Sequence, residues 1–340
     1  MRAAIVRTHG TPDTLSVETL PDPVPARGEV VVQIEAVAAN FVDLLVIRGA
    51  YQFLPGLPFI PGKLPAGTIS AVGEDAGAWN TGDRVQTLAE HGGYANRIAV
   101  PATACIRLPA TMTFTEAAAM GLAYDTAWFA IHDRARAAAG ETMLVLGASG
   151  AVGLAAIELG KACGLKVIAG LTSPGKRALV LEAGADAVID LAVPDLHDGL
   201  RQQTHDVTAG RGADIVLDML GGDFFDAAIR AVAWRGRLVV VGFAAGRIPV
   251  LKVNYVLLKN IEVTGLQISD YRKRRPDLIR HCYSEIFRLF EEGRVHAPPT
   301  TAFGLDLVKE ALHKLQERDV SGRIVLLPSE APDTGAQTAA

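Results

Sequence analysis

An apolar strand pattern in the middle of the chain runs directly into a glycine-rich turn, and a helical pattern follows at once. After the strand Thr142–Leu146 come three glycines, each separated from the next by two residues. In such a turn the first glycine permits the tight bend, the second lets backbone N–H groups approach a pyrophosphate, and the third allows close packing of helix on strand. The helix N-terminus then faces the phosphate charge. A ligand-free tight turn is the alternative, but the strand–turn–helix context favours a dinucleotide site. Its residues are Gly147, Ala148, Ser149, Gly150, Ala151, Val152 and Gly153.

The end of the next predicted strand, Lys166–Leu171, distinguishes the two nicotinamide cofactors. NAD sites place an acidic residue there, about 20 residues beyond the glycines, to hold the ribose 2′-hydroxyl. Residues 166–181 contain no Asp or Glu. Instead, hydroxyls and two cations stand where a 2′-phosphate would lie, and cations suit a phosphate. The alternative is that the two cations merely solvate a helix start. The missing acid favours NADPH, with Thr172, Ser173, Lys176 and Arg177 as its ligands.

The predicted secondary structure changes in type near residue 122. Before it, short β-branched runs separated by Pro and Gly turns predict a compact, barrel-like β domain. After it, Val/Ile/Leu-rich strands alternate with helices, which predicts an α/β unit with a parallel, doubly wound sheet. Beyond the strand Ile261–Leu266 the pattern reverts to the first type, so we expect the α/β unit to be an insertion. The small, polar tail 329–340 is predicted to be disordered. The remaining expected elements include helices Ala151–Cys163, Gly175–Glu182, Asp195–Val207, Phe224–Ala233, Pro276–Glu292 and Asp306–Gln316, and a closing strand Ile324–Leu327.

Length and charge narrow the class of protein. The chain has 340 residues, enough for two domains, and a formal net charge of −4. No broad basic face is implied, which argues against nucleic acid as the main partner. The N-terminus resembles a strand more than a signal peptide, and no run approaches the length that spans a bilayer. The three cysteines are far apart in sequence, so a reducing cytoplasm is expected.

Residues Asn40–Tyr51 are similar to the NFxDxxxRxGxY stretch of zinc-independent quinone oxidoreductases. With the β-rich start, the central glycine motif and the returning C-terminus, the chain resembles the medium-chain dehydrogenase/reductase superfamily, in its zeta-crystallin-like branch, over about residues 1–328. The resemblance implies an α/β fold in two domains. A GroES-like β-rich barrel domain would comprise residues 1–122 and 267–328, and an inserted Rossmann domain, residues 123–266, would bind NADPH.

The same resemblance implies a site without metal. Asn40, Lys63 and Leu122 stand at or near the positions of the family's catalytic zinc ligands, and none offers thiolate, imidazole or carboxylate. Zinc stabilises the charge that builds up on a ketone oxygen during reduction. Without it, hydride transfer favours an acceptor that spreads the charge itself, such as a quinone, an enone or an enoyl thioester. We therefore expect a small-molecule quinone or enone as the acceptor.

The resemblance also assigns residue roles. Tyr51 is expected to donate to the developing oxyanion, the alternative being a lid residue whose hydroxyl meets water. Asn40 is expected to orient the nicotinamide ribose or the substrate oxygen, the alternative being a turn cap. Thr126, in a segment expected to start a helix, is placed near the nicotinamide. The other cofactor residues implied are Gly242, Phe243 and Ala244 at the carboxamide, and Arg318 at the 2′-phosphate.

Several alternatives stay open. Lys63 replaces an acidic element of the family, which favours an anionic acceptor such as an acyl-CoA unless it is simply a surface lysine. A cofactor-binding, crystallin-like protein with little turnover, an enoyl-CoA reductase and a zinc-free alcohol dehydrogenase compete with the quinone reductase hypothesis. A homodimer is expected through the cofactor domains. The apolar stretch Asn254–Leu266 could supply its surface, although buried core would explain that stretch equally well.

Overall fold

The computed structural model describes residues 1–317, 320, 322–329 and 337–338. The contacts within the chain divide it into two compact units. The first unit comprises Met1–Leu122 and Ala297–Ala340, and the second comprises Ala123–His296. The second unit thus continues past residue 266, where the sequence suggested a boundary. Helices α8 (Ile268–Arg274) and α9 (Pro276–Glu291) belong to it because Arg272 pairs with the buried Asp125. In the part of the chain that the structure describes, no helix is both long and apolar enough to cross a membrane.

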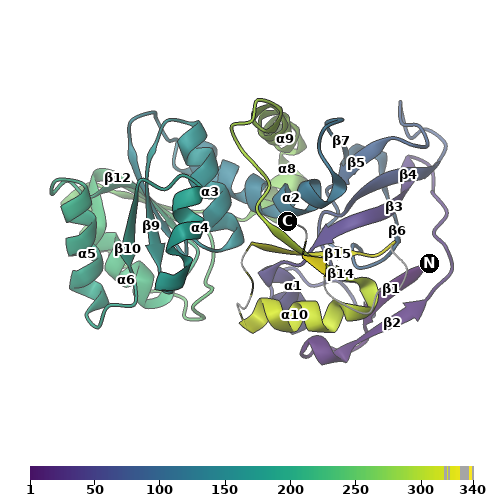
Figure 1. The fold of residues 1–340 in the computed structure, drawn as a ribbon, viewed down its shortest axis with the longest axis horizontal. Coiled ribbons are helices and arrows are strands. Elements are labelled where there is room, and N and C mark those ends of the chain that lie inside the picture. Colours follow the sequence, from purple (N-terminus) through teal and green to yellow (C-terminus); the bar gives the residue numbers. More distant parts are fainter. Residues whose placement is uncertain (318–319, 321, 330–336, 339–340) are drawn as a thin grey trace. The chain divides into compact units, whose positions relative to one another are not determined.

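The second unit contains a six-stranded, all-parallel sheet in the order β10-β9-β8-β11-β12-β13. Figure 1 labels β9, β10 and β12 of this sheet, with helices α3 to α6 around them. The predicted doubly wound parallel sheet is therefore confirmed. Successive strands are added on one side of β8 up to β10 and then on its other side from β11 onward, so the strand order reverses between β8 and β11. Ligands of such sheets bind outside the carboxyl ends of the strands at this switch point. The strands are β8 (Thr142–Leu146), β9 (Lys166–Leu171), β10 (Ala187–Asp190), β11 (Ala213–Asp218), β12 (Val232–Val240) and β13 (Glu262–Gly265).

Apolar strands and amphipathic helices build the core of this unit. Leu144, Leu146 and Val216 are fully buried in one cluster with residues of the connecting helices. One predicted boundary is wrong: the helix expected over Phe224–Ala233 ends at Ala231, because Val232 and Ala233 are buried in β12. The helices are α3 (Ala151–Ala162), α4 (Arg177–Glu182), α5 (Leu196–Val207), α6 (Gly222–Ala231) and α7 (Val253–Lys259).

The first unit is built around β3 (Glu29–Ala38), whose ten residues make it the longest described strand. It pairs antiparallel with β4 (Ala66–Val72), β6 (Arg97–Pro101) and the C-terminal β15 (Arg323–Leu327). Both ends of the chain therefore share one sheet (Figure 1). The other elements are β1 (Arg2–Val6), β2 (Leu15–Thr19), β5 (Arg84–Thr87), β7 (Cys105–Arg107), β14 (Thr300–Gly304), α1 (Phe41–Ile47) and α10 (Val308–Glu317).

Three residues of the predicted tail 329–340 are described. The Ser329 hydroxyl donates to the Ile34 carbonyl oxygen at 2.6 Å. Gln337–Thr338 form β16, which pairs antiparallel with β14. The other residues of that tail lie outside the described part, so for them disorder stays a prediction.

Candidate functional site

The glycine turn links β8 to α3 through short backbone contacts. Gly147 has φ +75°, a conformation that favours glycine. The N–H of Ala148 donates to Gly170 of the neighbouring strand at 3.2 Å, and the N–H of Gly150 donates back to Gly147 at 3.0 Å. A Cβ added to Gly153 would lie 2.5 Å from the Gly147 oxygen and 2.6 Å from the Ala148 oxygen. The third glycine thus allows helix and strand to touch, as its spacing predicts.

The N-terminus of α3 is suited to an anion. Gly150 is the N-cap residue, and it has no side chain that could accept hydrogen bonds from the first N–H groups of the helix. The twelve-residue helix also carries the positive end of its dipole there. A phosphate placed at this end would satisfy the N–H groups that the N-cap leaves unpaired.

The segment after β9 lies at the same edge of the sheet. β9 pairs parallel with β8, and Gly170 stands opposite Leu146, so the two strands end side by side. Thr172, Ser173 and Arg177 are exposed just beyond that end. The first acidic residue after the strand is Glu182, at the end of α4. The predicted 2′-phosphate residues therefore lie near the glycine turn, with no carboxylate among them.

Residues 242–244 reach this edge from the other side of β8. Leu146 of β8 stands opposite Asp218 at the end of β11. The N–H of Gly242 donates to the Asp218 carbonyl oxygen at 3.2 Å, and the N–H of Ala244 donates to the Met219 carbonyl oxygen at 3.0 Å. Phe243, between them, is 37% exposed. The structure thus brings Gly242, Phe243 and Ala244 to the same edge as the glycine turn.

Asp218 is a residue of this edge that the sequence analysis missed. Its Oδ1 accepts hydrogen bonds from the N–H groups of Leu220 and Gly221, both at 2.9 Å, and so fixes the turn into α6. Its Oδ2 is buried and has no hydrogen-bond partner among the described residues. Burial raises the pKa of Asp218 to about 6. The sequence did contain a signal for this residue: Asp218 ends an apolar strand and is followed shortly by two glycines, Gly221 and Gly222.

Thr126 and Arg318 are two further predicted cofactor residues. The prediction that the segment of Thr126 starts a helix is wrong. Thr126 lies near the end of α2 (Phe114–Phe129), which begins earlier because residues 116–120 are good helix formers. Its hydroxyl donates to the Asp125 carboxylate at 3.3 Å. Arg318 lies outside the described residues, so its role at the 2′-phosphate stays a prediction.

Asn40 is held at both ends of its amide within the first unit. Its Nδ2 donates to the Ala38 carbonyl oxygen at 3.0 Å, and its Oδ1 accepts from the Arg323 guanidinium at 2.6 Å. Asn40 is also the N-cap residue of α1, and the Asp43 carboxylate accepts its backbone N–H at 2.9 Å. Asn40 thus occupies the N-cap position, but its amide oxygen accepts from Arg323. Its part in catalysis stays a prediction.

Tyr51 lies next to a buried cation. The Lys63 ammonium is 5.7 Å from the centroid of the Tyr51 ring and donates to the Glu90 carboxylate at 2.5 Å and to the Glu90 carbonyl oxygen at 3.1 Å. Lys63 is only 5% exposed. The alternative that Lys63 is simply a surface lysine is therefore wrong. The sequence could not show this, since nothing in its spacing reports burial.

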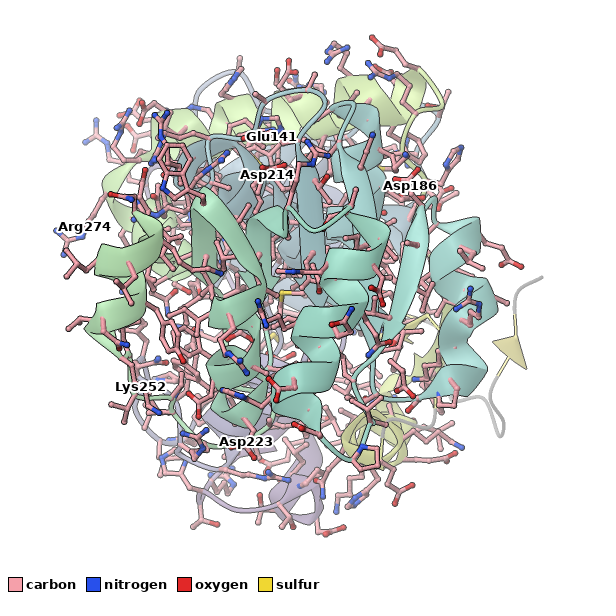
Figure 2. The ribbon with its side chains drawn as sticks, turned by 90° about the vertical axis from the view of Figure 1, so that its left-hand side faces the viewer. Glu141, Asp186, Asp214, Asp223, Lys252 and Arg274 are labelled. Atoms are coloured by element: carbon pink, nitrogen blue, oxygen red, sulfur yellow. The ribbon has the colours of Figure 1, made fainter. Side chains whose placement is uncertain are left out.

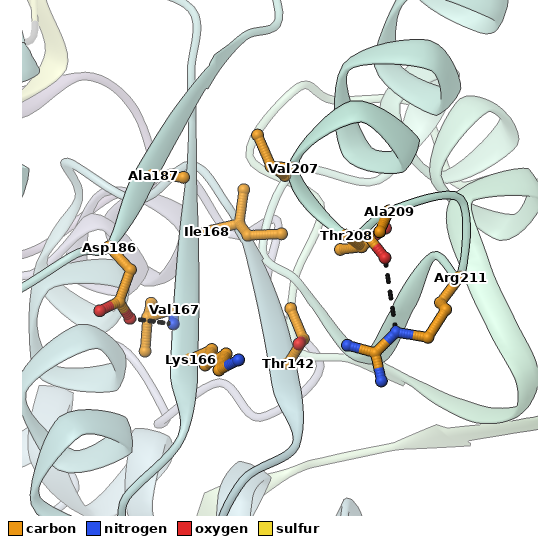
Figure 3. A pocket seen from close by; sticks show the side chains of 10 residues that line it. All are labelled: Thr142, Lys166, Val167, Ile168, Asp186, Ala187, Val207, Thr208, Ala209 and Arg211. Carbon is orange, nitrogen blue, oxygen red and sulfur yellow. Dashed lines mark hydrogen bonds between the residues drawn. The ribbon is translucent and has the colours of Figure 1, made fainter.

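A cavity of about 310 Å³ lies at the opposite edge of the parallel sheet (Figure 3). It opens at the amino ends of β8 and β9, beside Thr142 and Lys166, and so it is not part of the dinucleotide site. The carboxylates of Glu141, Asp186 and Asp214 also lie at this amino edge (Figure 2). The carboxyl edge, where the glycine turn lies, is thereby kept apart from these three negative charges.

Fold and site together define a class of protein. A parallel sheet with a glycine turn at its switch point, joined to a GroES-like β-rich unit, is typical of dinucleotide-dependent oxidoreductases. Residues 26–110 match the alcohol dehydrogenase GroES-like domain, and residues 151–284 match the family described as zinc-binding dehydrogenase. Within the described ranges, no group of three or more His, Cys, Asp or Glu side chains could hold a metal ion.

Individual relatives narrow the class. The chain is 34% identical over 332 residues to the quinone oxidoreductase-like protein 2 homolog of Nematostella vectensis, covering 96% of this chain and 88% of that one. The structure of Escherichia coli quinone oxidoreductase in complex with NADPH is similar with a TM-score of 0.88 and 26% identity, over 96% of this chain and 100% of that one. A mycobacterial protein in complex with NADPH has a TM-score of 0.89 and 28% identity over the same shares. The chain belongs to the quinone oxidoreductase-like family of medium-chain dehydrogenases/reductases.

Proposed function

We propose that this protein is an NADPH-dependent reductase that transfers hydride to a quinone or an α,β-unsaturated carbonyl compound without zinc. The observation that carries the proposal is the carboxyl edge of the parallel sheet. It combines a glycine turn that leaves room for a pyrophosphate with an acid-free segment, Thr172–Arg177, beside it. The NADPH complexes of two similar solved structures support the same cofactor.

The chain's own residues would bind and orient the cofactor, which supplies the hydride when bound. The N–H groups at the start of α3 would hold the pyrophosphate, because Gly150 leaves them without a side-chain cap. Thr172, Ser173, Lys176 and Arg177 would hold the 2′-phosphate through hydroxyls, an ammonium and a guanidinium. Residues 242–244, on the other side of β8, would border the nicotinamide end.

The donor set of the first unit supports a reaction without zinc. The Asn40 carboxamide oxygen accepts from a guanidinium, and Lys63 brings an ammonium. One of these cations, Lys63, stands at a position where the family's zinc enzymes have a ligand, and the other, Arg323, is hydrogen-bonded to Asn40 at a second such position. Positive charge at or beside the ligand positions would repel a metal cation. The acceptor must then delocalise the negative charge itself, which quinones and enones do and simple ketones do not.

The test is NADPH oxidation by purified, chelator-treated protein with quinones, enones and enoyl-CoA esters offered in turn, and NADH in parallel. We expect turnover that survives the chelator and prefers NADPH, and the best acceptor then identifies the substrate class. Loss of turnover after chelation would contradict the zinc-free reaction. Tight NADPH binding with no oxidation by any acceptor would point instead to a cofactor-binding protein with little turnover.

We further propose a homodimer formed through the sixth strand of the parallel sheet. β13 is an edge strand, and unpaired edges of this kind can be extended by a second copy. The neighbouring α7, whose start Lys252 marks in Figure 2, contains no buried residue. Ile261 of the stretch Asn254–Leu266 is buried core, whereas α7 and the segment before it offer an apolar surface that a second copy could cover. Five apolar side chains of residues 248–258 are each at least 69% exposed: Ile248, Val250, Val253, Leu257 and Leu258.

A further inference from the structure

We propose that Lys63 is the oxyanion-binding residue of the acceptor site. Its ammonium, held beside Tyr51 by Glu90, would stabilise the negative charge that develops on the oxygen of an aromatic carbonyl acceptor. The proposal rests on the proposed reductase function and names the residue that recognises its substrate. It also names the substrate class, a planar conjugated ring with a carbonyl oxygen.

The backbone fixes the position of Lys63. The residues on either side have positive φ angles, +90° at Gly62 and +52° at Leu64. A Cβ at Gly62 would lie 2.4 Å from the Tyr94 ring, and the N–H of Leu64 donates to the Ala89 carbonyl oxygen at 2.8 Å. A leucine in the left-handed region is strained, and such strain persists only where the surroundings hold it and is concentrated at functional sites. The ammonium is thus presented by a rigid turn.

Lys63 carries the positive charge beside Tyr51, and Glu90 and His91 lie close to it. Its side chain is almost fully buried, and the Glu90 carboxylate offsets part of the cost of burying it. Burial first, and then the charge of Lys63, lower the pKa of the neighbouring His91, so that imidazole is neutral at neutral pH. A buried cation attracts a developing anion more strongly than an exposed one, because water screens it less.

The surroundings of the ammonium suit an apolar ligand. Tyr51 and Phe53 meet edge to face with their ring centroids 6.4 Å apart. Phe53, Leu54 and Leu57 follow in the same loop and are 40–44% exposed. A buried cation beside the Tyr51 ring, in a loop that exposes further apolar side chains, is complementary to an apolar ring whose oxygen carries negative charge. A simple alcohol or a polyanionic acceptor would fit this combination less well.

The acceptor would gain a hydride: a C–H bond of NADPH breaks, and its electron pair forms a new C–H bond on the conjugated acceptor, which is reduced by two electrons while NADPH is oxidised to NADP⁺. The π electrons of the conjugated system move to the carbonyl oxygen, which becomes an enolate or phenolate. That oxygen is the atom Lys63 would stabilise. One proton from solvent completes the reduction, so Lys63 acts by its charge and does not transfer a proton.

The first measurement compares turnover of Lys63→Met and Lys63→Arg with wild type. Losing one oxyanion-stabilising group should lower kcat roughly a hundredfold, and Lys63→Arg should recover most of it because the charge returns. Lys309→Met, the same change on the exposed face of α10, is the matched control and should turn over like wild type. A kcat for Lys63→Met within a fewfold of wild type would overturn the proposal.

The second measurement does not depend on turnover. p-Nitrophenol is a ring whose oxygen changes colour on ionisation, so absorbance reports which form the protein binds. Wild type should bind the phenolate in preference to the phenol, lowering the apparent pKa of the bound ligand. Lys63→Met, checked for folding by circular dichroism, should lose that shift. If wild type shows no shift, or Lys63→Met keeps it, the proposal fails. If the shift is present but no acceptor is reduced, the oxyanion site stands and the proposed reductase function fails.

Discussion

Replacing Gly153 with alanine tests whether the glycine turn is shaped by contact between α3 and β8. The new Cβ would lie 2.5 Å from the Gly147 oxygen and 2.6 Å from the Ala148 oxygen. Both are backbone atoms, so no side-chain rotation relieves the clash and α3 must move. Overpacking of this kind costs about 1–3 kcal/mol, while alanine gains about 1 kcal/mol over glycine inside a helix. The expected net loss in the free energy of unfolding is therefore between about 0 and 2 kcal/mol.

Urea denaturation of wild type and Gly153→Ala measures that loss, and NADPH titration measures the effect on the site. Because a shift of α3 displaces the N–H groups proposed to hold the pyrophosphate, we expect NADPH affinity to fall about tenfold or more. Gly121→Ala is the matched control. Gly121 is also buried in a helix, but its added Cβ would meet nothing closer than 3.7 Å. That variant should be as stable as wild type or more so. A Gly153→Ala protein with wild-type stability and NADPH affinity would refute the contact argument.

Three other predictions follow from single residues. Arg177→Glu should weaken NADPH binding roughly tenfold and leave NADH binding unchanged in fluorescence titrations. The control Arg201→Glu, an exposed charge reversal on α5, should change neither affinity. Equal losses of NADPH and NADH affinity in Arg177→Glu would show that Arg177 does not bind the 2′-phosphate. Burial raises the pKa of Asp218 from 3.8 to about 6, so the folded state binds this proton more tightly and the free energy of unfolding falls as the pH rises across that window. Asp218→Asn keeps an oxygen for the two N–H donors. In urea denaturation at several pH values, the variant's free energy of unfolding should fall less with rising pH and exceed that of wild type by about 1–3 kcal/mol at pH 8. An unchanged pH profile would show that Asp218 does not titrate as described. Leu257→Asp should turn the proposed dimer into a monomer in light scattering, and a wild-type protein that is itself monomeric would contradict the dimer.

Local patterns predicted the parallel-sheet unit well. β8 and β9 begin and end at the predicted residues, because a strand buried on both faces is a continuous apolar run between turns. α1, Phe41–Ile47, is not among the helices that the sequence predicts. Its apolar residues are nearly continuous and show no helical period, and its N-terminus is organised by the Asn40–Asp43 contact. α8 was also missed, because polar and basic residues occupy most of it.

The cofactor site was more predictable than the acceptor site. Gly147, Gly150 and Gly153 act within one short segment, so their spacing states their geometry. Asn40 depends instead on Arg323, which is 283 positions away in the sequence. Among the described residues, the Asp218 Oδ2 is buried without a hydrogen-bond partner, which follows from how the chain packs around it. Contacts and burial of this kind leave no local period in the sequence.

The sequence by itself determined the strand–glycine–helix turn, the lack of an acid after β9 and hence the expected cofactor, because these properties depend on residues close together in the chain. Only the tertiary structure decided which polar groups are buried and what they pair with. Lys63 is the clearest example, since the sequence around it is compatible with a surface lysine as well as with a buried one. It became a candidate for binding substrate when the fold enclosed its ammonium between Glu90 and Tyr51, and burial is what gives a charge its strength.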